Sequence, residues 1–360
     1  MPRSASFLML TCQVGAEHAV KLELARRWPA FRFAYSRPGF MTFKLPADQP
    51  LADDFNLESV FARSYAFSLG KAAGGDPARL ARQVRELAGD RPYEKLHVFP
   101  RDTAAAGEHG YEPGLTPAAD EAAALIRAEL DRDQLDRDQL DRRPLAREGQ
   151  LVLDCVLVQP NEWWVGQHRA RGWASCRPGG LSRLKLPDDA VSRAYLKMEE
   201  ALRWSKLPAR PGQRVVEIGC APGGSCQALL RRGMSVAGID PAAMHPALLA
   251  HPNFVHIRKR AADVRRRDFR QVRWLVADMN VAPTYTLDAV EAIVSHPQVD
   301  VRGLLLTLKL LDWNLAEQVP GYLARVHAWG FPYVRARQLQ HNRQEICVAA
   351  FRRKPGRKSK

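Results

Sequence analysis

The residues of this sequence best placed for chemistry are polar side chains at the ends of short apolar runs. Asp278 and Lys309 each follow such a run, and Glu345 begins another. The carboxyl ends of parallel strands meet at one edge of a sheet, and Glu345 joins that edge if its own strand runs antiparallel. A lysine there can take a proton when its pKa is lowered, and a second cation from Lys197, on a preceding helix, would lower it. The set predicts proton transfer with Lys309 as the base.

A glycine-rich turn follows the first apolar run of the same region. Glycine lets a backbone approach a ligand closely, and a helix that begins at once presents unpaired N–H groups. The second run ends in Asp240, a carboxylate suited to accept hydrogen bonds from the hydroxyls of a nucleoside ribose. The turn reads G-x-x-x-G-G and not the dinucleotide pattern G-x-G-x-x-G, which disfavours a nicotinamide cofactor. The candidate cofactor residues of the turn are Gly219, Cys220, Ala221, Pro222, Gly223 and Gly224.

These residues need a sheet to position them, and the pattern after Gly212 indicates one. Short apolar runs alternate with helical stretches, which is typical of a parallel sheet covered on both faces. We therefore predict a doubly wound, Rossmann-like α/β domain over residues 213–352. Strands are expected at 214–218, 235–239, 254–257, 274–277, 303–308 and 345–350, and helices at 189–204 and 225–232.

The first 168 residues predict two smaller α+β units, residues 1–73 and 76–168, separated at Gly74-Gly75. Strands are expected at 7–12, 31–35, 40–45, 95–99 and 150–158, and helices at 16–28, at 77–87 and from 117 onward. The tandem DRDQL repeat at 131–145 should form a solvated helix extension or loop. Residues 169–212 should form an extended basic connector and a helix, and residues 353–360 a basic tail.

Composition indicates which classes of partner the protein could bind. A net charge of +15 and a pI near 9.9 favour nucleic acid, although a GC-rich genome also yields an arginine-rich protein. The six cysteines form no CxxC or Cys/His cluster, so we expect no metal, no disulfide framework and a cytoplasmic setting. No apolar run reaches the roughly eighteen residues of a membrane span. We expect a monomer without membrane contact.

Taken together, the four polar residues resemble the Lys-Asp-Lys-Glu tetrad of the FtsJ-like RNA ribose methyltransferases, in the same order and setting. Other segments resemble the bacterial branch of that family that acts on a cytidine of 23S, large-subunit, ribosomal RNA. Those segments are Phe61–Arg63, Arg183–Pro187, Ser192–Arg193, Leu196–Glu200, Ala221–Gly224, Ala336–Leu339 and His341.

The resemblance implies S-adenosylmethionine as cofactor and methylation of a ribose 2′-hydroxyl in ribosomal RNA. It also implies an antiparallel last strand, a ferredoxin-like first unit and a THUMP-like RNA-binding second unit. The marks of base methylation, an (Asp/Asn)-Pro-Pro-aromatic turn or a cysteine after the fourth strand, are absent, because Asp278-Met279-Asn280 stands there. Asp278 is a candidate for cofactor contact as well as for catalysis.

Some positions depart from the family pattern. Ala194 replaces a cofactor-contacting serine, Arg260 stands where an aspartate reads adenine, and Glu217 replaces an aspartate; Asp263 is an alternative for the adenine contact. Two other functions therefore stay open. One is an RNA-binding ribosome-assembly factor with a degenerate cofactor pocket, and the other is an S-adenosylmethionine-dependent methyltransferase acting on a substrate other than RNA.

Overall fold

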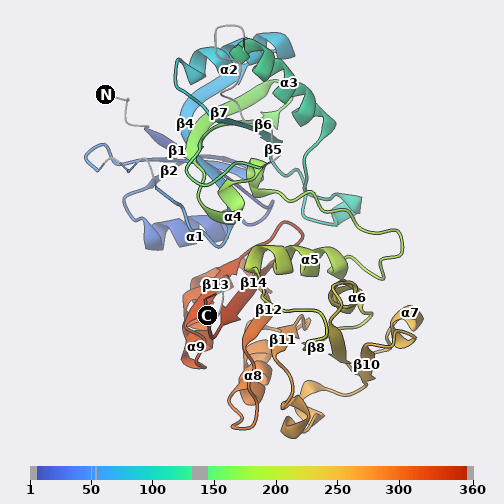
Figure 1. Cartoon of the computed structure of the whole chain (residues 1–360). Coiled ribbons are helices and arrows are strands. Elements are labelled where there is room, and N and C mark those ends of the chain that lie inside the picture. Colours follow the sequence, from blue (N-terminus) through green and yellow to red (C-terminus); the bar gives the residue numbers. More distant parts are fainter. Residues whose placement is uncertain (1–5, 50, 53–54, 132–144, 355–360) are drawn as a thin grey trace. The chain divides into compact units, whose positions relative to one another are not determined.

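The computed structural model describes residues 6–49, 51–52, 55–131 and 145–354 and divides into two compact units, Met1–Arg183 and Leu184–Lys360 (Figure 1). The division falls inside the connector predicted at 169–212. Most of the predicted tandem repeat and the tail beyond Lys354 lie outside the described residues. No described helix is long and apolar enough to cross a membrane.

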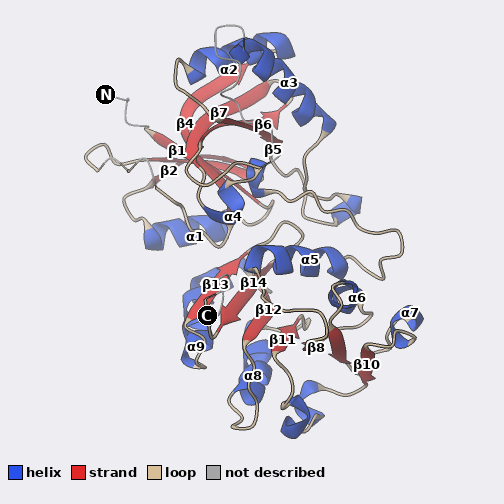
Figure 2. Ribbon diagram, viewed as in Figure 1, coloured by secondary structure: helices blue, strands red, loops and turns tan. Residues whose placement is uncertain are grey.

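One mixed sheet of seven strands supports the first unit, in the order β2-β3-β1-β4-β7-β6-β5 (Figure 2). Strands β5 and β6 pair in parallel and the other neighbours pair antiparallel. The strands are β1 (Phe7–Cys12), β2 (Arg32–Arg37), β3 (Phe40–Lys44), β4 (Ala62–Ala73), β5 (Lys95–Pro100), β6 (Leu151–Gln159) and β7 (Glu162–Arg169). The five predicted strands are confirmed to within two residues at each end.

Strands β4 and β7 were not predicted, and β4 changes the architecture. It pairs with β1 on one side and β7 on the other, so the strands of both predicted α+β units belong to a single sheet. Its residues alternate poorly between apolar and polar, which hides it from a period-two pattern. Gly70, with φ of +140°, accompanies a register shift opposite β7 and interrupts the pattern further.

The helices of this unit are α1 (Glu17–Arg27), α2 (Pro77–Ala88) and α3 (Pro117–Asp131). Helix α2 begins where the sequence provides both a cap and a favoured first residue: Asp76 accepts hydrogen bonds from two backbone N–H groups, and Pro77 follows it. The apolar faces of α2 and α3 bury Leu80, Val84 and Ile126 against Leu153 and Val165 of the sheet. These helices cover one face of the sheet and supply much of the core beneath them.

The prediction of an extended connector is wrong for residues 172–180. This stretch forms α4 (Gly172–Ser175) and a 3-10 turn, η2 (Pro178–Gly180), which contact β4 and β5. Gly172, Gly179 and Gly180 all have positive φ, so the glycines that suggested an open linker instead allow tight turns.

Three buried polar side chains converge on neighbouring strands of this unit: His97 of β5, Asp154 of β6 and His168 of β7. His168 Nδ1 lies 2.5 Å from Asp154 Oδ2, and His168 Nε2 donates to the Ser175 carbonyl at 2.9 Å. Burial alone would lower the pKa of His168, but the Asp154 charge and these hydrogen bonds raise it. Burial opposes the charge of Asp154, yet His168 and His97 lower its pKa. Asp154 and His168 therefore form a buried ion pair, and the bond from His168 to the Ser175 carbonyl attaches α4 to the sheet.

Within the described ranges, these three side chains are close enough together to be considered for a metal ion. Two ligands of one tetrahedral zinc, each about 2.1 Å from it, lie about 3.4 Å apart. The 2.5 Å separation of His168 Nδ1 and Asp154 Oδ2 is that of a hydrogen bond and is shorter than this ligand spacing.

The second unit confirms the predicted doubly wound α/β sheet. Its strand order is β10-β9-β8-β11-β12-β14-β13, and β14 pairs antiparallel to β12, as the resemblance implied. The strands are β8 (Arg214–Ile218), β9 (Ser235–Ile239), β10 (Phe254–Ile257), β11 (Trp274–Ala277), β12 (Gly303–Lys309), β13 (Tyr333–Arg337) and β14 (Glu345–Phe351). Only the edge strand β13, which alternates charged and apolar residues, was not predicted.

The helices of the second unit are α5 (Ala194–Ser205), α6 (Gly224–Arg231), α7 (Pro246–Leu249), α8 (Pro283–Val294) and α9 (Val319–Ala328), with short 3-10 turns η3 (Ala261–Asp263), η4 (Arg266–Phe269) and η5 (Trp313–Gln318). Helix α5 begins five residues later than predicted. Residues 189–191 are instead tied to α6, where Gln227 bonds the backbone of Asp189 and Val191. This tie fixes the approach to the helix that carries Lys197.

Candidate active site

The four polar residues predicted to converge do so at one edge of the second sheet. Lys309 is the last residue of β12 and pairs in register with Glu345, the first residue of β14. Asp278 follows β11, the parallel neighbour of β12. Lys309 Nζ lies 2.7 Å from Asp278 Oδ1 and forms an ion pair and hydrogen bond with Glu345 Oε2. The strand order that puts β11, β12 and β14 side by side is therefore what assembles the group.

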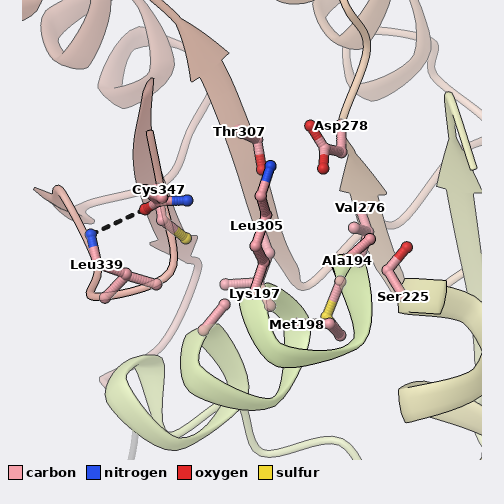
Figure 3. A pocket seen from close by; sticks show the side chains of 12 residues that line it. Ala194, Lys197, Met198, Ser225, Val276, Asp278, Leu305, Thr307, Leu339 and Cys347 are labelled. Atoms are coloured by element: carbon pink, nitrogen blue, oxygen red, sulfur yellow. Dashed lines mark hydrogen bonds between the residues drawn. The ribbon is translucent and has the colours of Figure 1, made fainter. Parts of the chain in front are cut away.

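Lys197 reaches the same group from α5. Its Nζ lies 2.6 Å from Glu345 Oε1, so one carboxylate separates the two ammonium groups. Figure 3 shows the Lys197 side chain extending from the helix along Leu305 toward the strand ends where Asp278 lies. The side chains of Lys197, Asp278 and Lys309 are 20%, 16% and 15% exposed, whereas that of Glu345 is 4% exposed. The two ammonium groups and Asp278 are thus reachable, and Glu345 is the buried centre.

The charges of this group set its protonation. Burial would raise the pKa of Glu345, but Lys197 and Lys309 outweigh it and lower that pKa to about 2. Burial would lower the pKa of Lys309, but Asp278 and Glu345 outweigh it and raise that pKa. The prediction that the second cation lowers the pKa of Lys309 is therefore wrong for this structure. The carboxylates that position the ammonium also stabilise its charged form.

A side chain missed in the sequence completes the group. Asn342, in the loop between β13 and β14, donates from Nδ2 to Glu345 Oε1 at 3.2 Å, and its Oδ1 accepts from the Leu339 N–H at 2.8 Å, the dashed bond of Figure 3. Asn342 also lines a cavity of about 20 Å³ with Lys197 and Asp278. An asparagine in a loop carries no periodic signal, so only the fold could reveal its place.

The glycine turn joins β8 to α6, as predicted. Gly219 and Gly223 have φ values of +75° and +116°, a region that favours glycine. A Cβ on Gly219 would lie 2.8 Å from the Asp278 carbonyl oxygen, and one on Gly224 would lie 2.8 Å from that of Ser192. These glycines are required for the turn to pack between the loop after β11 and the approach to α5. The turn and the tetrad are thereby held against each other.

Asp240 and Cys220 have roles within the turn itself. Asp240 follows β9 and is half-buried; its Oδ2 accepts from the Ala221 N–H at 3.0 Å and its Oδ1 from the Ala242 N–H at 2.8 Å. Each oxygen keeps a second lone pair, so hydroxyl groups can still bind there. The Cys220 side chain is buried, with Sγ 3.7 Å from Met244 Sδ, and Pro222 is exposed. Cys220 can therefore offer a ligand its backbone only.

Glu217 lies on β8 beneath this turn and is fully buried. Burial raises its pKa to about 7, although hydrogen bonds from Cys226 and Ser225 act in the opposite direction. Its carboxyl group is used inside the fold, where it connects β8 to the first turn of α6. The replacement of an aspartate by the longer glutamate is accommodated by these two donors.

Three further positions bear on a cofactor. Ala194, at the start of α5, lines the cavity beside Lys197. The Ser192 hydroxyl, two residues earlier, is buried without a hydrogen-bond partner. Arg260 and Asp263 are both exposed at η3, after β10. The adenine contact therefore stays a prediction for either residue.

Comparison with known proteins agrees with this geometry. Residues 190–326 match the FtsJ-like methyltransferase family, in which S-adenosyl-L-methionine is the methyl donor. The chain is 35% identical over 181 residues to "Ribosomal RNA large subunit methyltransferase M" of Xylella fastidiosa (strain 9a5c), covering 48% of this chain and 50% of that one. It is 35% identical over 185 residues to the protein of the same name from Halorhodospira halophila, covering 50% and 52%.

The chain spans about half the length of the curated relatives it matches. Among solved structures, a putative hemolysin from Lactococcus lactis is 18% identical, with 46% of this chain and 90% of that one covered, at a TM-score of 0.38. A likeness of that size carries no functional information. Residues 190–326 therefore match the FtsJ-like methyltransferase family, and the doubly wound sheet and the converging tetrad of the second unit agree with that match.

Proposed function

We propose that this protein transfers a methyl group from S-adenosylmethionine to a ribose 2′-hydroxyl of large-subunit ribosomal RNA, with a cytidine of 23S RNA as the target. The observation that carries the proposal is the chain of contacts Lys197–Glu345–Lys309–Asp278 at the carboxyl edge of the sheet. The names of the relatives supply the substrate class. The cytidine and the 2′-oxygen rest on the resemblance of the tetrad.

The residues around the turn fit a nucleoside cofactor. The Ser192 hydroxyl is buried beside the turn with no hydrogen-bond partner, and Asp240 retains acceptor capacity at the end of β9. Asp240 would hold the ribose of the cofactor, and the backbone of residues 219–224 would line its amino-acid part. S-adenosylmethionine supplies a methyl group activated by a sulfonium.

The tetrad would handle the proton. A ribose hydroxyl is a very weak acid, so its oxygen needs a base as it attacks the methyl carbon. As the hydroxyl oxygen takes the methyl group from the sulfonium, Lys309 Nζ in its neutral form would accept the hydroxyl proton. Because Asp278 and Glu345 raise the pKa of Lys309, that lysine must first release a proton to solvent. Lys197 keeps Glu345 oriented and adds positive charge beside the hydroxyl.

The first unit is proposed to bind RNA. Its strands and helices are proposed to comprise a ferredoxin-like part, residues 1–73, and a THUMP-like part, residues 76–168, which share the seven-stranded sheet. The net charge of +15 belongs to the chain as a whole and favours contact with a phosphate backbone, whereas the RNA-binding role of the first unit rests on the resemblance. The protein is proposed to act as a cytoplasmic monomer on naked or partly assembled RNA.

Isotope transfer tests the proposal. Purified protein, cofactor labelled in the methyl group, and large-subunit ribosomal RNA from a strain lacking the corresponding gene should give labelled RNA. Nuclease digestion should release the label in an alkali-resistant dinucleotide, because a 2′-O-methyl group blocks cleavage there. Label in a base, or no label in RNA, would refute the proposal.

Calorimetry separates the alternative of an assembly factor, which Ala194 and the exposed Arg260 favour. That alternative requires RNA binding that weakens steeply with salt, together with no detectable heat of cofactor binding. Cofactor binding without RNA binding at low salt would instead favour a methyltransferase for another substrate.

A further inference from the structure

A buried carboxylate next to the tetrad has no part in the proton transfer. Glu200 lies on α5, three residues after Lys197, and is 1% exposed. Residues three apart on a helix share a face, so both side chains point from α5 toward the loop between β13 and β14. A carboxylate at that depth requires strong donors.

The donors are two consecutive backbone N–H groups of this loop. Gln340 N–H donates to Glu200 Oε1 at 2.9 Å, and His341 N–H donates to Glu200 Oε2 at 3.1 Å. Both carboxylate oxygens are thus used on one peptide segment, which fixes the loop in position and orientation relative to α5. A charged acceptor makes such bonds stronger than a neutral one would.

The same loop carries the side chain that orients Glu345. Asn342 follows His341 directly, is held by the Leu339 N–H at 2.8 Å, and donates to Glu345 Oε1 at 3.2 Å. That oxygen also lies 2.6 Å from Lys197 Nζ. Helix α5 therefore meets the start of β14 through two parallel links, one from Lys197 and the other from Glu200 through the loop.

We propose that Glu200 is a positioning residue that holds the loop 339–342 against α5 and so fixes the spacing of Lys197, Glu345 and Lys309. The role is additional to those of the four tetrad residues, and its catalytic part rests on the proposed methyl transfer. Displacement of a reacting group by about 1 Å can cost on the order of 100-fold in rate. An opened Lys197–Glu345 contact would be a displacement of this kind.

The test is Glu200→Gln in the full-length protein. The amide has nearly the same shape, but its NH₂ group faces a backbone N–H, so only one of the two hydrogen bonds can survive. The rate constant kcat should fall on the order of 10- to 100-fold, and the Kd for S-adenosylmethionine, measured by calorimetry, should stay within about twofold. Hydrogen exchange of the peptide covering 338–344 should accelerate.

Glu199→Gln is the matched control. Glu199 is the adjacent residue of α5, is 7% exposed, and binds Arg232 through both oxygens at 3.0 and 2.8 Å, toward α6 and away from the loop. The Glu199→Gln variant should have a lower melting temperature. Hydrogen exchange at 338–344 should not accelerate, and kcat should not fall comparably. Equal loss of kcat in both variants would overturn the proposal, since it would indicate general destabilisation.

NMR of ¹³C-methylated lysines keeps the proposal falsifiable without an activity assay. The Lys309 resonance should titrate at lower pH in Glu200→Gln than in wild type, because looser carboxylates stabilise the ammonium less. An unchanged titration with unchanged exchange would overturn the positioning role even if methyl transfer is established. A shifted titration in a protein that transfers no methyl group would keep the positioning role and refute only the proposed function.

If Glu200→Gln does not fold, Asn342→Ala tests the same link between the loop and Glu345. It removes the loop's contact with Glu345 and the acceptor of the Leu339 N–H, but it leaves the Glu200 bonds to the backbone. The rate constant kcat should therefore fall and exchange at 339 should accelerate, while exchange at 340–341 stays slow. Full activity in Asn342→Ala would overturn the link from Glu200 to Glu345.

Discussion

The two units each contain a cluster of ionisable side chains, and the two clusters differ in their exposure to solvent. In the first unit, His97, Asp154 and His168 lie on the neighbouring strands β5, β6 and β7 and are 0%, 2% and 4% exposed. In the second, Lys197 and Lys309 lie at helix and strand positions on the sheet edge, with side chains 20% and 15% exposed. Ionisable groups that are closed off from solvent act on the fold, whereas partly exposed groups can meet a substrate.

The pairing chemistry differs in the same way. His168 forms one hydrogen bond with Asp154 and another with the Ser175 carbonyl, so both of its ring nitrogens bind within the protein. Lys309 faces two carboxylates, its ammonium group has three donors, and its side chain is 15% exposed. Four changes would break or sharpen this comparison.

The largest expected effect is that of Lys309→Ala on methyl transfer. Loss of a positioned base should lower kcat by about 10²- to 10⁴-fold, with little change in cofactor Kd. Isotope transfer to ribosomal RNA measures it. Full activity in this variant would show that Lys309 is not the base. The second cluster would then stabilise the fold, as the first one does.

Asp154→Ala should act on stability instead. It leaves the buried His168 without its carboxylate, and removal of one partner of a buried ion pair costs about 3–5 kcal/mol. Urea unfolding followed in the first unit should show this loss, while kcat of the remaining folded protein should change little. Asp154→Asn, which keeps the shape, should lose less. A large fall in kcat with no loss of stability would contradict the structural assignment.

Glu217→Gln tests what burial alone does to a carboxylate. Glu217 and Glu345 are both buried, yet burial raises the pKa of Glu217 to about 7 whereas two lysines lower that of Glu345 to about 2. A raised pKa means that the folded form holds its proton more tightly. The Glu217 contribution to stability is thus fully present below the unfolded value of 4.5 and is lost as pH rises through about 7.

The loss for Glu217 should total about 3 kcal/mol. In Glu217→Gln this part of the pH dependence should disappear, as measured by denaturant unfolding between pH 5 and pH 8. A wild-type protein whose stability does not fall over that range relative to the variant would contradict the raised pKa.

The smallest effect is the pH dependence of kcat itself. The base must be neutral, and the pKa of Lys309 is raised above its ordinary value of 10.5, so kcat should rise about tenfold per pH unit through neutral pH. A profile that levels off near pH 7 would mean that cofactor and substrate lower this pKa in the complex, as a nearby sulfonium charge would. A profile that falls with pH would exclude a lysine base.

Much of the second unit could be predicted because its signals are local. Apolar runs such as 214–218, 235–239 and 274–277 match the observed strands residue for residue, since a strand buried on both faces must be continuously apolar. The polar residues that end these runs therefore stood out. In the first unit β4 and β7 were missed, because their pairing partners, and not their own periodicity, define them.

The sequence by itself determined which residues could form the tetrad and that they would share one sheet edge, because strand ends and residue types are written in the chain. Only the tertiary structure decided that Glu345 lies between both lysines and that the pKa of Lys309 is raised. The same is true of the tie from Glu200 and Asn342 into the group. The physical reason is that burial and charge act through space, here between helix α5 and a loop that follows it 140 residues later in the chain.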